Sequence, residues 1–568
     1  MSLPPSVPAP SLLRAPSTVI AVLASLFAGV LLFLSSPSGS THNLWPLTWI
    51  GLVPTIWAVM RAPTHRRAFV YGLLTGAVIS AGGFPWLLGL LHRFAGLPLV
   101  AALPVFVLFC LAQGAVFGLF AWLLRVVVAR TRLPFALAVP LVLVPLEMVY
   151  PFLLPWYFAI AQAWVLPVIQ LAELTGPLGV TFCLAMVNGV IHDLLDARLE
   201  GRPLPRRPLL AVLATMLLVL AFGFTRIHQI DARWAAAPKL RVGVVQPNIR
   251  YDLKPQADPQ DREASAAEAE LLAENNRKHQ EASARLEAQG AELIVWPESS
   301  YPYELPHVTA PIHNLDVRLR GSFHTPLLFG AVTHDRDRQV WFNSALLLDG
   351  KGDLSAPYDK IFLLVFGEYI PLADTFPALG DLFPDMAPFA RGAGPTTFAL
   401  PDARAPGGAW RLGPLICDED ILQRFGTDVG RLHPHAFINL TNDAWFGAGS
   451  EPWQHLALAV FRTVEHRTGM VRATPTGVSS FLDATGRVRA HLDVRDPPEQ
   501  GSIPADIALD EVSMLEGGHT VYAGIGSLWG HADLLGVLLG TALLVVLGAA
   551  LRDHRRARKS APTRASVG

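Results

Sequence analysis

The chain has 568 residues, of which 51% are hydrophobic and 16% charged, and its formal net charge is −1. Soluble proteins carry about 25% charged residues, so this composition excludes an ordinary soluble enzyme and predicts membrane-embedded segments. The near-zero net charge provides no basic field that would recruit nucleic acid. Its three cysteines are too few for a disulfide framework and too far apart for a zinc site.

The apolar residues are concentrated in the first 232 positions and in one block near the end of the sequence. Eight segments are each close to the ~20 apolar residues that cross a hydrocarbon core about 30 Å thick. We therefore predict a multi-pass α-helical bundle whose eight spans are residues 17–35, 44–60, 68–91, 97–124, 133–153, 177–195, 208–225 and 529–551.

Arginine and lysine are concentrated in the loops that follow the even-numbered spans, whereas the loop 36–43 has neither. Cytoplasmic loops of membrane proteins carry this excess of positive charge. The pattern predicts that both termini are cytoplasmic and that the long segment between spans seven and eight is extracytoplasmic. The basic residues are Arg61, Arg66, Arg67, Arg125, Arg130, Arg132, Arg198, Arg202, Arg206, Arg207, Arg552, Arg555, Arg556, Arg558 and Lys559.

Residues 154–176 are apolar but have no Arg or Lys, and they fall on the predicted outer side. We interpret them as a re-entrant or interfacial segment, with aromatic side chains at headgroup depth (Trp156, Tyr157 and Trp164). The alternative is a ninth span, which would invert the downstream topology and is disfavoured by the basic cluster at 198–207. Glu147 precedes this segment and Glu173 lies near its end, and we expect them to line a lipid entrance or to reach water.

Charged residues return between about Pro238 and Val512, where strand-like runs alternate with helical ones. Residues 240–248 and 291–299 read as strands, and 261–289 as a long amphipathic helix. This alternation is typical of a layered α/β domain. The predicted domains are therefore a membrane bundle (1–232), an extracytoplasmic α/β domain (233–515), and a last span with a basic tail (516–568).

Three strand ends of this domain carry candidate chemistry: Glu298 in IVWPES, Lys360 in YDKIFLLVFGEYIP, and Cys417 in GPLICDED. Taken singly, each residue type is more often solvated or packed than catalytic. Cys417, however, is the only cysteine outside the predicted spans, and it has no partner thiol in an oxidising compartment. A nucleophilic thiol needs a base and an oxyanion donor, and a carboxylate and an ammonium are suitable for these tasks.

These blocks, together with TNDAWFG at 441–447, resemble the Glu–Lys–Cys triad of the nitrilase superfamily. With the membrane scaffold and the FGEYIP block, the whole chain resembles the apolipoprotein N-acyltransferase family. The resemblance implies an eight-span bundle in a bacterial inner membrane. This bundle would carry an extracytoplasmic nitrilase-like αββα sandwich.

The resemblance also implies roles for individual residues. Cys417 matches the nucleophile, Glu298 the proton acceptor, and Lys360 the group that stabilises the oxyanion. The implied reaction moves an acyl chain from a phospholipid such as phosphatidylethanolamine, through a Cys thioester, to the α-amine of an S-diacylglyceryl-cysteine at a lipoprotein N-terminus. No metal, organic cofactor or nucleic acid is implied, and we expect a monomer. The supporting site residues are Glu368, Glu419, Asn442 and Trp445.

The chain departs from the family pattern at two positions. Asp418 follows the nucleophile where the family commonly has Tyr, and Pro255 stands where it often has Trp. A carboxylate beside a thiol disfavours the thiolate, so we expect Asp418 to point away or to pair with a cation such as Arg391 or Arg411.

The apolar stretches 361–366 and 376–389 are either arms that dip into the membrane interface or ordinary packing segments.

Two other functions are alternatives to the acyltransferase. A membrane-anchored nitrilase-like amidohydrolase would use the same triad with water as the acceptor, but an amidase does not need seven preceding spans. A transporter would show interrupted spans in matching halves, which the sequence does not.

Overall fold

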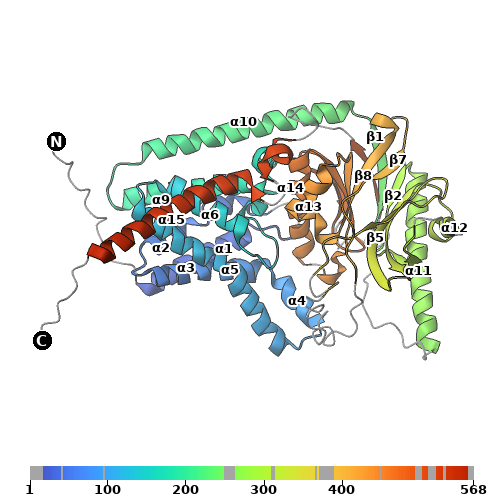
Figure 1. The fold of residues 1–568 in the computed structure, drawn as a ribbon, viewed down its shortest axis with the longest axis horizontal. Helices are drawn as coiled ribbons and strands as arrows, with labels where there is room; N and C mark the ends of the chain where they lie inside the picture. Colours follow the sequence, from blue (N-terminus) through green and yellow to red (C-terminus); the bar gives the residue numbers. More distant parts are fainter. Residues whose placement is uncertain are drawn as a thin grey trace.

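The computed structural model consists of a helical bundle followed along its long axis by an α/β sandwich (Figure 1). The long helix α10 (Arg206–Ala236) runs beside the bundle and leads directly into the first strand of the sandwich. The structure describes residues 17–39, 43–93, 96–248, 262–308, 312, 314–364, 368–369, 389–447, 449–492, 502–508, 520–528 and 532–560.

The predicted spans all fall on helical structure, but the helices differ in length. Four are long and apolar enough to cross a membrane, and a fifth qualifies if α3 and α4, which meet at a 60° bend, form one broken span. The first, second and fifth predicted spans lie on shorter apolar helices. The bundle comprises α1 (Thr18–Leu34), η1 (Trp45–Trp49), α2 (Val53–Met60), α3 (His65–Gly83), α4 (Pro85–Arg93), α5 (Leu99–Arg130), α6 (Phe135–Val149), α9 (Pro177–Leu199), α10 and α15 (Leu534–Ser560).

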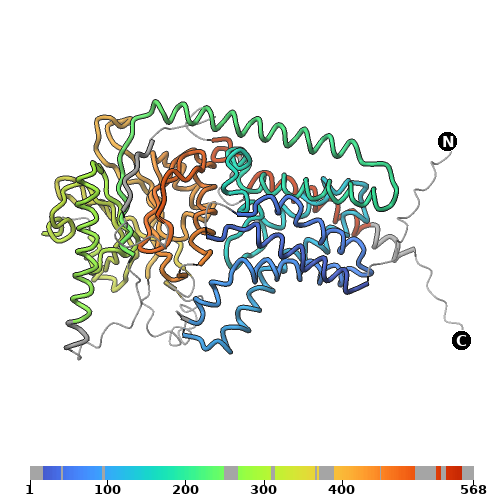
Figure 2. Tube along the Cα trace, turned by 180° about the vertical axis from the view of Figure 1, so that it is seen from behind, coloured from blue at the N-terminus to red at the C-terminus, as the bar shows by residue number. Residues whose placement is uncertain are grey.

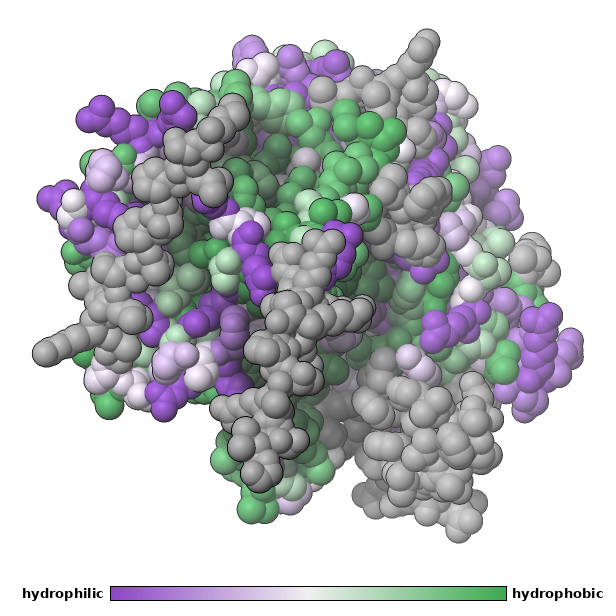
Figure 3. All heavy atoms as spheres, turned by 60° about the vertical axis from the view of Figure 1, so that its left-hand side comes forward, coloured by the Kyte–Doolittle hydropathy of each residue, from purple (hydrophilic) through white to green (hydrophobic). Residues whose placement is uncertain are grey.

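The outer surface of the bundle is apolar. Figure 3 shows hydrophobic residues spread over this part of the molecule between groups of hydrophilic ones. Large side chains on three of the long helices are well exposed, including Leu108 at 68%, Leu218 at 71% and Leu544 at 69%. Exposed apolar area of this extent is unfavourable in water, so the bundle has the surface of a protein solvated by lipid.

The α/β part is a four-layer sandwich in which two sheets pack face to face between two layers of helices (Figures 1 and 2). One sheet has the order β13-β1-β2-β4-β5-β6 with β3 added on β4, and the other has the order β12-β11-β10-β9-β8-β7. In each sheet the central neighbours are parallel: β1, β2 and β4 in the first, and β8, β9 and β10 in the second. The outer helix layer is α11 and α12, and the layer next to the bundle is α13 and α14.

The sequence correctly predicted a strand before and after the long helix, and the strand-like runs that follow. The strands are β1 (Lys239–Val245), β2 (Leu293–Val295), β3 (Tyr301–Pro306), β4 (Leu327–Asp335), β5 (Val340–Leu348), β6 (Tyr358–Asp359), β7 (Phe398–Pro401), β8 (Ala409–Ile416), β9 (Ala436–Leu440), β10 (Gly469–Ala473), β11 (Ser479–Leu482), β12 (Val488–Leu492) and β13 (Ser502–Ala508). The helices are α11 (Arg262–Ala288), α12 (Leu315–Arg320), α13 (Gln423–Gly430) and α14 (Glu451–His466).

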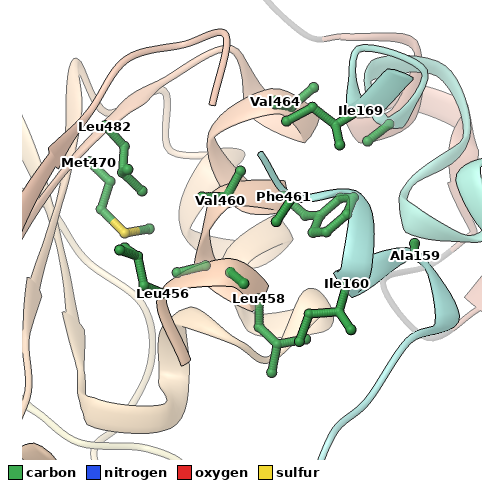
Figure 4. Packing of buried hydrophobic residues seen from close by; sticks show 14 of the residues in the cluster. Ala159, Ile160, Ile169, Leu456, Leu458, Val460, Phe461, Val464, Met470 and Leu482 are labelled. Atoms are coloured by element: carbon green, nitrogen blue, oxygen red, sulfur yellow. The ribbon is translucent and has the colours of Figure 1, made fainter. Parts of the chain in front are cut away.

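Residues 154–176 form three short helices that lie between the bundle and the sandwich: η2 (Phe158–Gln162), α7 (Leu166–Ile169) and α8 (Ala172–Thr175). None of them is long enough to be a ninth span. In Figure 4, Ile160 and Ile169 point toward Leu458, Phe461 and Val464 of α14, and these side chains are buried in one core. On the opposite side of α14, Leu456 lies toward Met470 and Leu482 of the sheet, so this helix joins the two parts of the molecule.

A buried ion cluster fastens the same junction. Glu173 of α8 accepts two hydrogen bonds of 2.8 Å from Arg226 of α10, and one of 2.6 Å from Arg467, which follows α14. Gln170 accepts from Arg467 at 2.6 Å. The expectation that Glu173 lines a lipid entrance or reaches water is therefore wrong, because its side chain has no exposure.

We predict that Glu173→Gln strongly destabilises the protein. The substitution leaves two buried guanidinium groups without their carboxylate, and removing one partner of a buried ion pair costs about 3–5 kcal/mol. Thermal unfolding in detergent should show a clearly lower Tm than in the wild type. Glu281→Gln, on the exposed face of α11, is the control and should leave the Tm unchanged. An unchanged Tm for Glu173→Gln would contradict this role.

Candidate active site

The sandwich brings the three candidate residues together from different strand ends. Glu298 follows β2, Lys360 follows β6, and Cys417 follows β8, which belongs to the other sheet. The carboxyl ends of parallel strands are where loops converge in such folds. The negative charge of Glu298 and the positive charge of Lys360 both act on the Cys417 thiol.

Lys360 is the centre of a group of buried charges. Its side chain is only 1% exposed, and its Nζ lies 2.8 Å from Glu368 Oε2, 3.4 Å from Asp418 Oδ1 and 3.8 Å from Glu298 Oε1. One amide joins two of these carboxylates, because Asn343 Nδ2 donates to Glu298 Oε1 at 2.7 Å and to Glu368 Oε1 at 2.8 Å. A single ammonium is thus shared by three carboxylates.

The Glu298 turn fits its place because β4 has a glycine beside it. A Cβ on Gly330 would lie 2.6 Å from both the Pro297 carbonyl oxygen and the Ser299 amide nitrogen, and 2.7 Å from Glu298 Cα. The Gly330 amide also donates to the Pro297 carbonyl at 3.2 Å. The absence of a side chain at this position therefore lets the turn pack on the sheet.

Cys417 begins a short 3₁₀ turn, η5 (Cys417–Asp420), and has a left-handed backbone with φ of 54°. This conformation costs a non-glycine residue about 1–3 kcal/mol and is typical of functional sites. The thiol is half-buried. Cys417 therefore stands at a sharp turn directly after a strand, as does the residue of a nucleophile elbow.

Glu419 holds this turn against the Lys360 loop. Its carboxylate accepts from the amides of Ile416 at 2.8 Å and Ile361 at 2.7 Å, and from the Tyr358 hydroxyl at 2.7 Å. It is fully buried. Glu419 thus connects the residues before Cys417 to the residues on both sides of Lys360.

Burial and the neighbouring charges determine how these groups titrate. Burial raises the pKa of Glu298 to about 7, although the Lys360 ammonium acts in the opposite direction. Burial, and then the charge of Glu298, hold the pKa of the Cys417 thiol well above its usual value. Although burial alone would lower the pKa of Lys360, the surrounding negative charges hold it well above its usual value. The resting site therefore has an ammonium, a protonated thiol and a carboxyl group poised near neutrality.

Asp418 pairs with Lys360, and the expectation that Arg391 or Arg411 pairs with it is wrong. Those guanidinium groups donate instead to the carbonyls of Ile361 and His433. Burial raises the pKa of Asp418, and Lys360 opposes this.

The other predicted supporting residues have different surroundings. Glu368 and Glu419 lie in the cluster as described, whereas Asn442 caps the turn η6 (Asp443–Trp445) by accepting from the Ala444 amide at 3.1 Å. Trp445 belongs to this turn and precedes Phe446. The ring centroids of Phe446 and Trp86 of α4 lie 5.0 Å apart. Pro255, residues 365–366 and residues 376–388 of the expected arms lie outside the described residues.

Sequence reasoning missed two residues of the site. Asn343 is a single amide within an apolar strand, and Tyr358 precedes Lys360 by two positions. The only available signal was a buried polar side chain on an otherwise apolar strand, which must find a partner. Which partner it finds depends on strand register, and this could not be derived from the sequence.

Glu147, like Glu173, is buried. The expectation that it reaches water is therefore wrong. It accepts a hydrogen bond from the Phe158 amide and lines a cavity of about 350 Å³ at the junction of the bundle and the sandwich. Tyr157, Gln423 and Asp533 also line this cavity. The cavity lies on the side of α13 rather than at the Lys360 cluster.

Among the described residues, one group has the composition of a metal site. Single ligand atoms of Asp443, Glu451 and His455 lie within 4.8 Å of one another, and all three residues are buried. Arg472 contacts both carboxylate oxygens of Asp443 at 3.1 Å. The Arg472 guanidinium therefore already provides a positive charge beside this carboxylate.

Two family models match the chain in the same order as the bundle and the sandwich. Residues 28–190 match the model of the apolipoprotein N-acyltransferase N-terminal domain, and residues 241–513 match the carbon–nitrogen hydrolase model. An apolipoprotein N-acyltransferase of Geobacter metallireducens is 31% identical over 532 residues, covering 92% of this chain and 94% of the relative. One of Azotobacter vinelandii is 31% identical over 553 residues, covering 95% and 96%. A solved amidase from Nesterenkonia sp. aligns with 48% of this chain and 91% of its own, at 20% identity and a TM-score of 0.31.

The bundle and the sandwich thus define a carbon–nitrogen hydrolase domain fused to an apolar helical domain. The chain belongs to the apolipoprotein N-acyltransferase family.

We predict that Asp418→Asn makes the Cys417 thiol more reactive at neutral pH. Removing a carboxylate beside the thiol lowers the thiol pKa, and one pKa unit corresponds to about tenfold more thiolate. The measurement is the rate of Cys417 alkylation by iodoacetamide between pH 6 and 10 in detergent. Asp337→Asn, on an exposed loop, is the control. A slower reaction in Asp418→Asn would show instead that Asp418 is needed to hold Lys360.

Proposed function

We propose that this protein is a phospholipid-dependent apolipoprotein N-acyltransferase, with Cys417 as nucleophile, Glu298 as general base and Lys360 as oxyanion donor. Membership of the family supports the activity. The observation that supports the residue roles is the convergence of a half-buried thiol, a carboxyl group with a pKa near 7 and a buried ammonium at adjoining strand ends.

In the first half-reaction, Glu298 takes the proton of the Cys417 thiol as sulfur attacks an ester carbonyl of the phospholipid. The Lys360 ammonium stabilises the negative oxygen of the tetrahedral intermediate. The carbon–oxygen ester bond then breaks, the lysophospholipid oxygen receives the proton from Glu298, and the acyl chain remains on Cys417 as a thioester.

In the second half-reaction, the α-amine of a diacylglyceryl-cysteine attacks the thioester carbonyl. Glu298 accepts the proton that the amine loses, and Lys360 stabilises the second tetrahedral intermediate. The carbon–sulfur bond breaks, Glu298 returns the proton to the thiolate, and an amide is formed. A base with a pKa near the working pH serves both directions of proton transfer.

The proposed arrangement in the inner membrane is an eight-span bundle with both termini cytoplasmic. Residues 1–232 form seven spans, residues 233–515 form the extracytoplasmic catalytic domain, and residues 516–568 form the last span and the basic tail. Supporting this arrangement, the basic loops follow even-numbered spans, and three of the long helices expose leucines. Both substrates are lipids, so the site would open at the outer membrane surface. A nitrilase-like amidohydrolase is the alternative, in which water replaces the amine.

We expect that the protein transfers a labelled acyl chain from phosphatidylethanolamine in liposomes to a diacylglyceryl-cysteine peptide, and that Cys417→Ser abolishes the transfer. The wild type should form a thiol-reversible adduct that is chased onto the peptide amine. Release of free fatty acid alone would support the amidohydrolase-type reaction. Transfer that survives in Cys417→Ser would contradict the nucleophile assignment.

The pH dependence tests the base. Because Glu298 must be deprotonated to accept the thiol proton and its pKa is about 7, the single-turnover acylation rate should rise about tenfold from pH 5.5 to 6.5 and level off above pH 7.5. Glu298→Gln should remove this rise of the rate with pH and reduce the acylation rate at least 100-fold. If the rate still rises with pH in Glu298→Gln, the titrating group is a different residue.

A further inference from the structure

Behind the Cys417 turn lies a second buried group of charges, contributed by four elements. Arg472 of β10 donates to Asp420 Oδ2 at 2.5 Å and to both oxygens of Asp443 at 3.1 Å. His455 of α14 has Nε2 2.8 Å from Asp420 Oδ1 and Nδ1 3.2 Å from Asp443 Oδ1. Glu451 Oε1 lies 3.6 Å from His455 Nδ1. All five side chains are buried.

The geometry determines the charge of His455. Both of its ring nitrogens face carboxylate oxygens, which only accept hydrogen bonds, so each nitrogen must carry a proton. Burial and the Arg472 charge act to lower the pKa of His455, but Asp420 and Asp443 outweigh them and raise it to about 10. Burial, and then the charge of Asp443, raise the pKa of Glu451 well above its usual value. Arg472 and the doubly protonated His455 thus form two cations that are hydrogen-bonded to Asp420 and Asp443.

This group is connected to the nucleophile turn at both ends. Asp420 is the last residue of the turn that Cys417 begins. Arg472 also donates to Asn439 Oδ1 at 2.9 Å, and Asn439 Nδ2 donates to the Cys417 carbonyl at 3.0 Å. The backbone of Cys417 has the strained left-handed φ, so its orientation depends on such contacts.

We propose that His455 and Arg472 are positioning residues of the nucleophile: as the two cations of this buried group, they hold Asp420 and the Cys417 carbonyl and thereby fix the direction of the thiol. The inference rests on the proposed function only in taking Cys417 as the nucleophile. His455 acts through Asp420, and Arg472 through Asp420 and Asn439. His455 also acts electrostatically on Asp418, which lies beside the thiol.

The helix that carries His455 gives this arrangement a link to the bundle. The preceding residue, Gln454, donates to the Gly83 carbonyl at 2.6 Å and accepts from the Trp86 indole at 3.1 Å. These two partners lie on either side of the bend between α3 and α4. Consecutive residues of α14 therefore contact the bend between α3 and α4 and the nucleophile turn.

The test measures the thiol directly, so it does not depend on the acyltransferase activity. The rate of Cys417 alkylation by iodoacetamide is followed from pH 6 to 10 in the folded full-length protein, in detergent. His455→Gln should slow alkylation at least tenfold across this pH range and change its pH dependence. His466 is a buried histidine on the same helix, and the control His466→Gln should leave the alkylation rate at each pH within twofold of the wild type. An unchanged rate and profile in His455→Gln would overturn the proposal.

Two further variants keep the test decisive if His455→Gln does not fold. Arg472→Lys keeps the charge but cannot reach Asp420, Asn439 and Asp443 together, and it should also slow alkylation at least tenfold. Glu451→Gln should have no effect, because Glu451 Oε1 lies 3.6 Å from His455 Nδ1, beyond hydrogen-bond distance. A slowed reaction in Glu451→Gln, or a stoichiometric divalent metal measured by mass spectrometry in the purified protein, would show a metal site instead and overturn the charge assignment.

Discussion

The site is organised around one buried ammonium. Lys360 is the shared partner of Glu298, Glu368 and Asp418, and without it three carboxyl groups would face one another in a low-dielectric environment. Burial, together with the charges of this group, keeps the thiol protonated at rest and raises the pKa of Glu298 to about 7.

The packing of the two sheets and the contacts around their strand ends position the Lys360 ammonium relative to the Cys417 thiol. Lys360 and Cys417 follow strands of different sheets, so the distance between them depends on how the two sheets pack. Glu419 joins the two loops directly, and Arg472 with His455 holds the thiol turn from behind. Helix α14 then connects these contacts to the short helices at 154–176 and to the bend between α3 and α4, so the proposed site and the apolar bundle form one packed unit.

The sequence predicted the part of this arrangement that depends on local pattern. The alternation of strands and helices, the long helix before β2, and the positions of Glu298, Lys360 and Cys417 at strand ends could all be read from motifs and periodicity. The partner of Asp418 could not, because it is a lysine more than fifty positions away, placed by sheet packing. The burial of Glu173 was missed for the same reason, since Arg226 and Arg467 come from distant segments.

The central claim is that the Lys360 ammonium controls the reactivity of Cys417. It is tested most directly by comparing the pH profile of Cys417 alkylation in the wild type and in Lys360→Met, which has a similar shape but no charge. We predict that the substitution raises the apparent thiol pKa by more than one unit, which corresponds to more than about 1.4 kcal/mol, and slows alkylation at neutral pH accordingly. An unchanged profile in a folded Lys360→Met protein would contradict this account of the site.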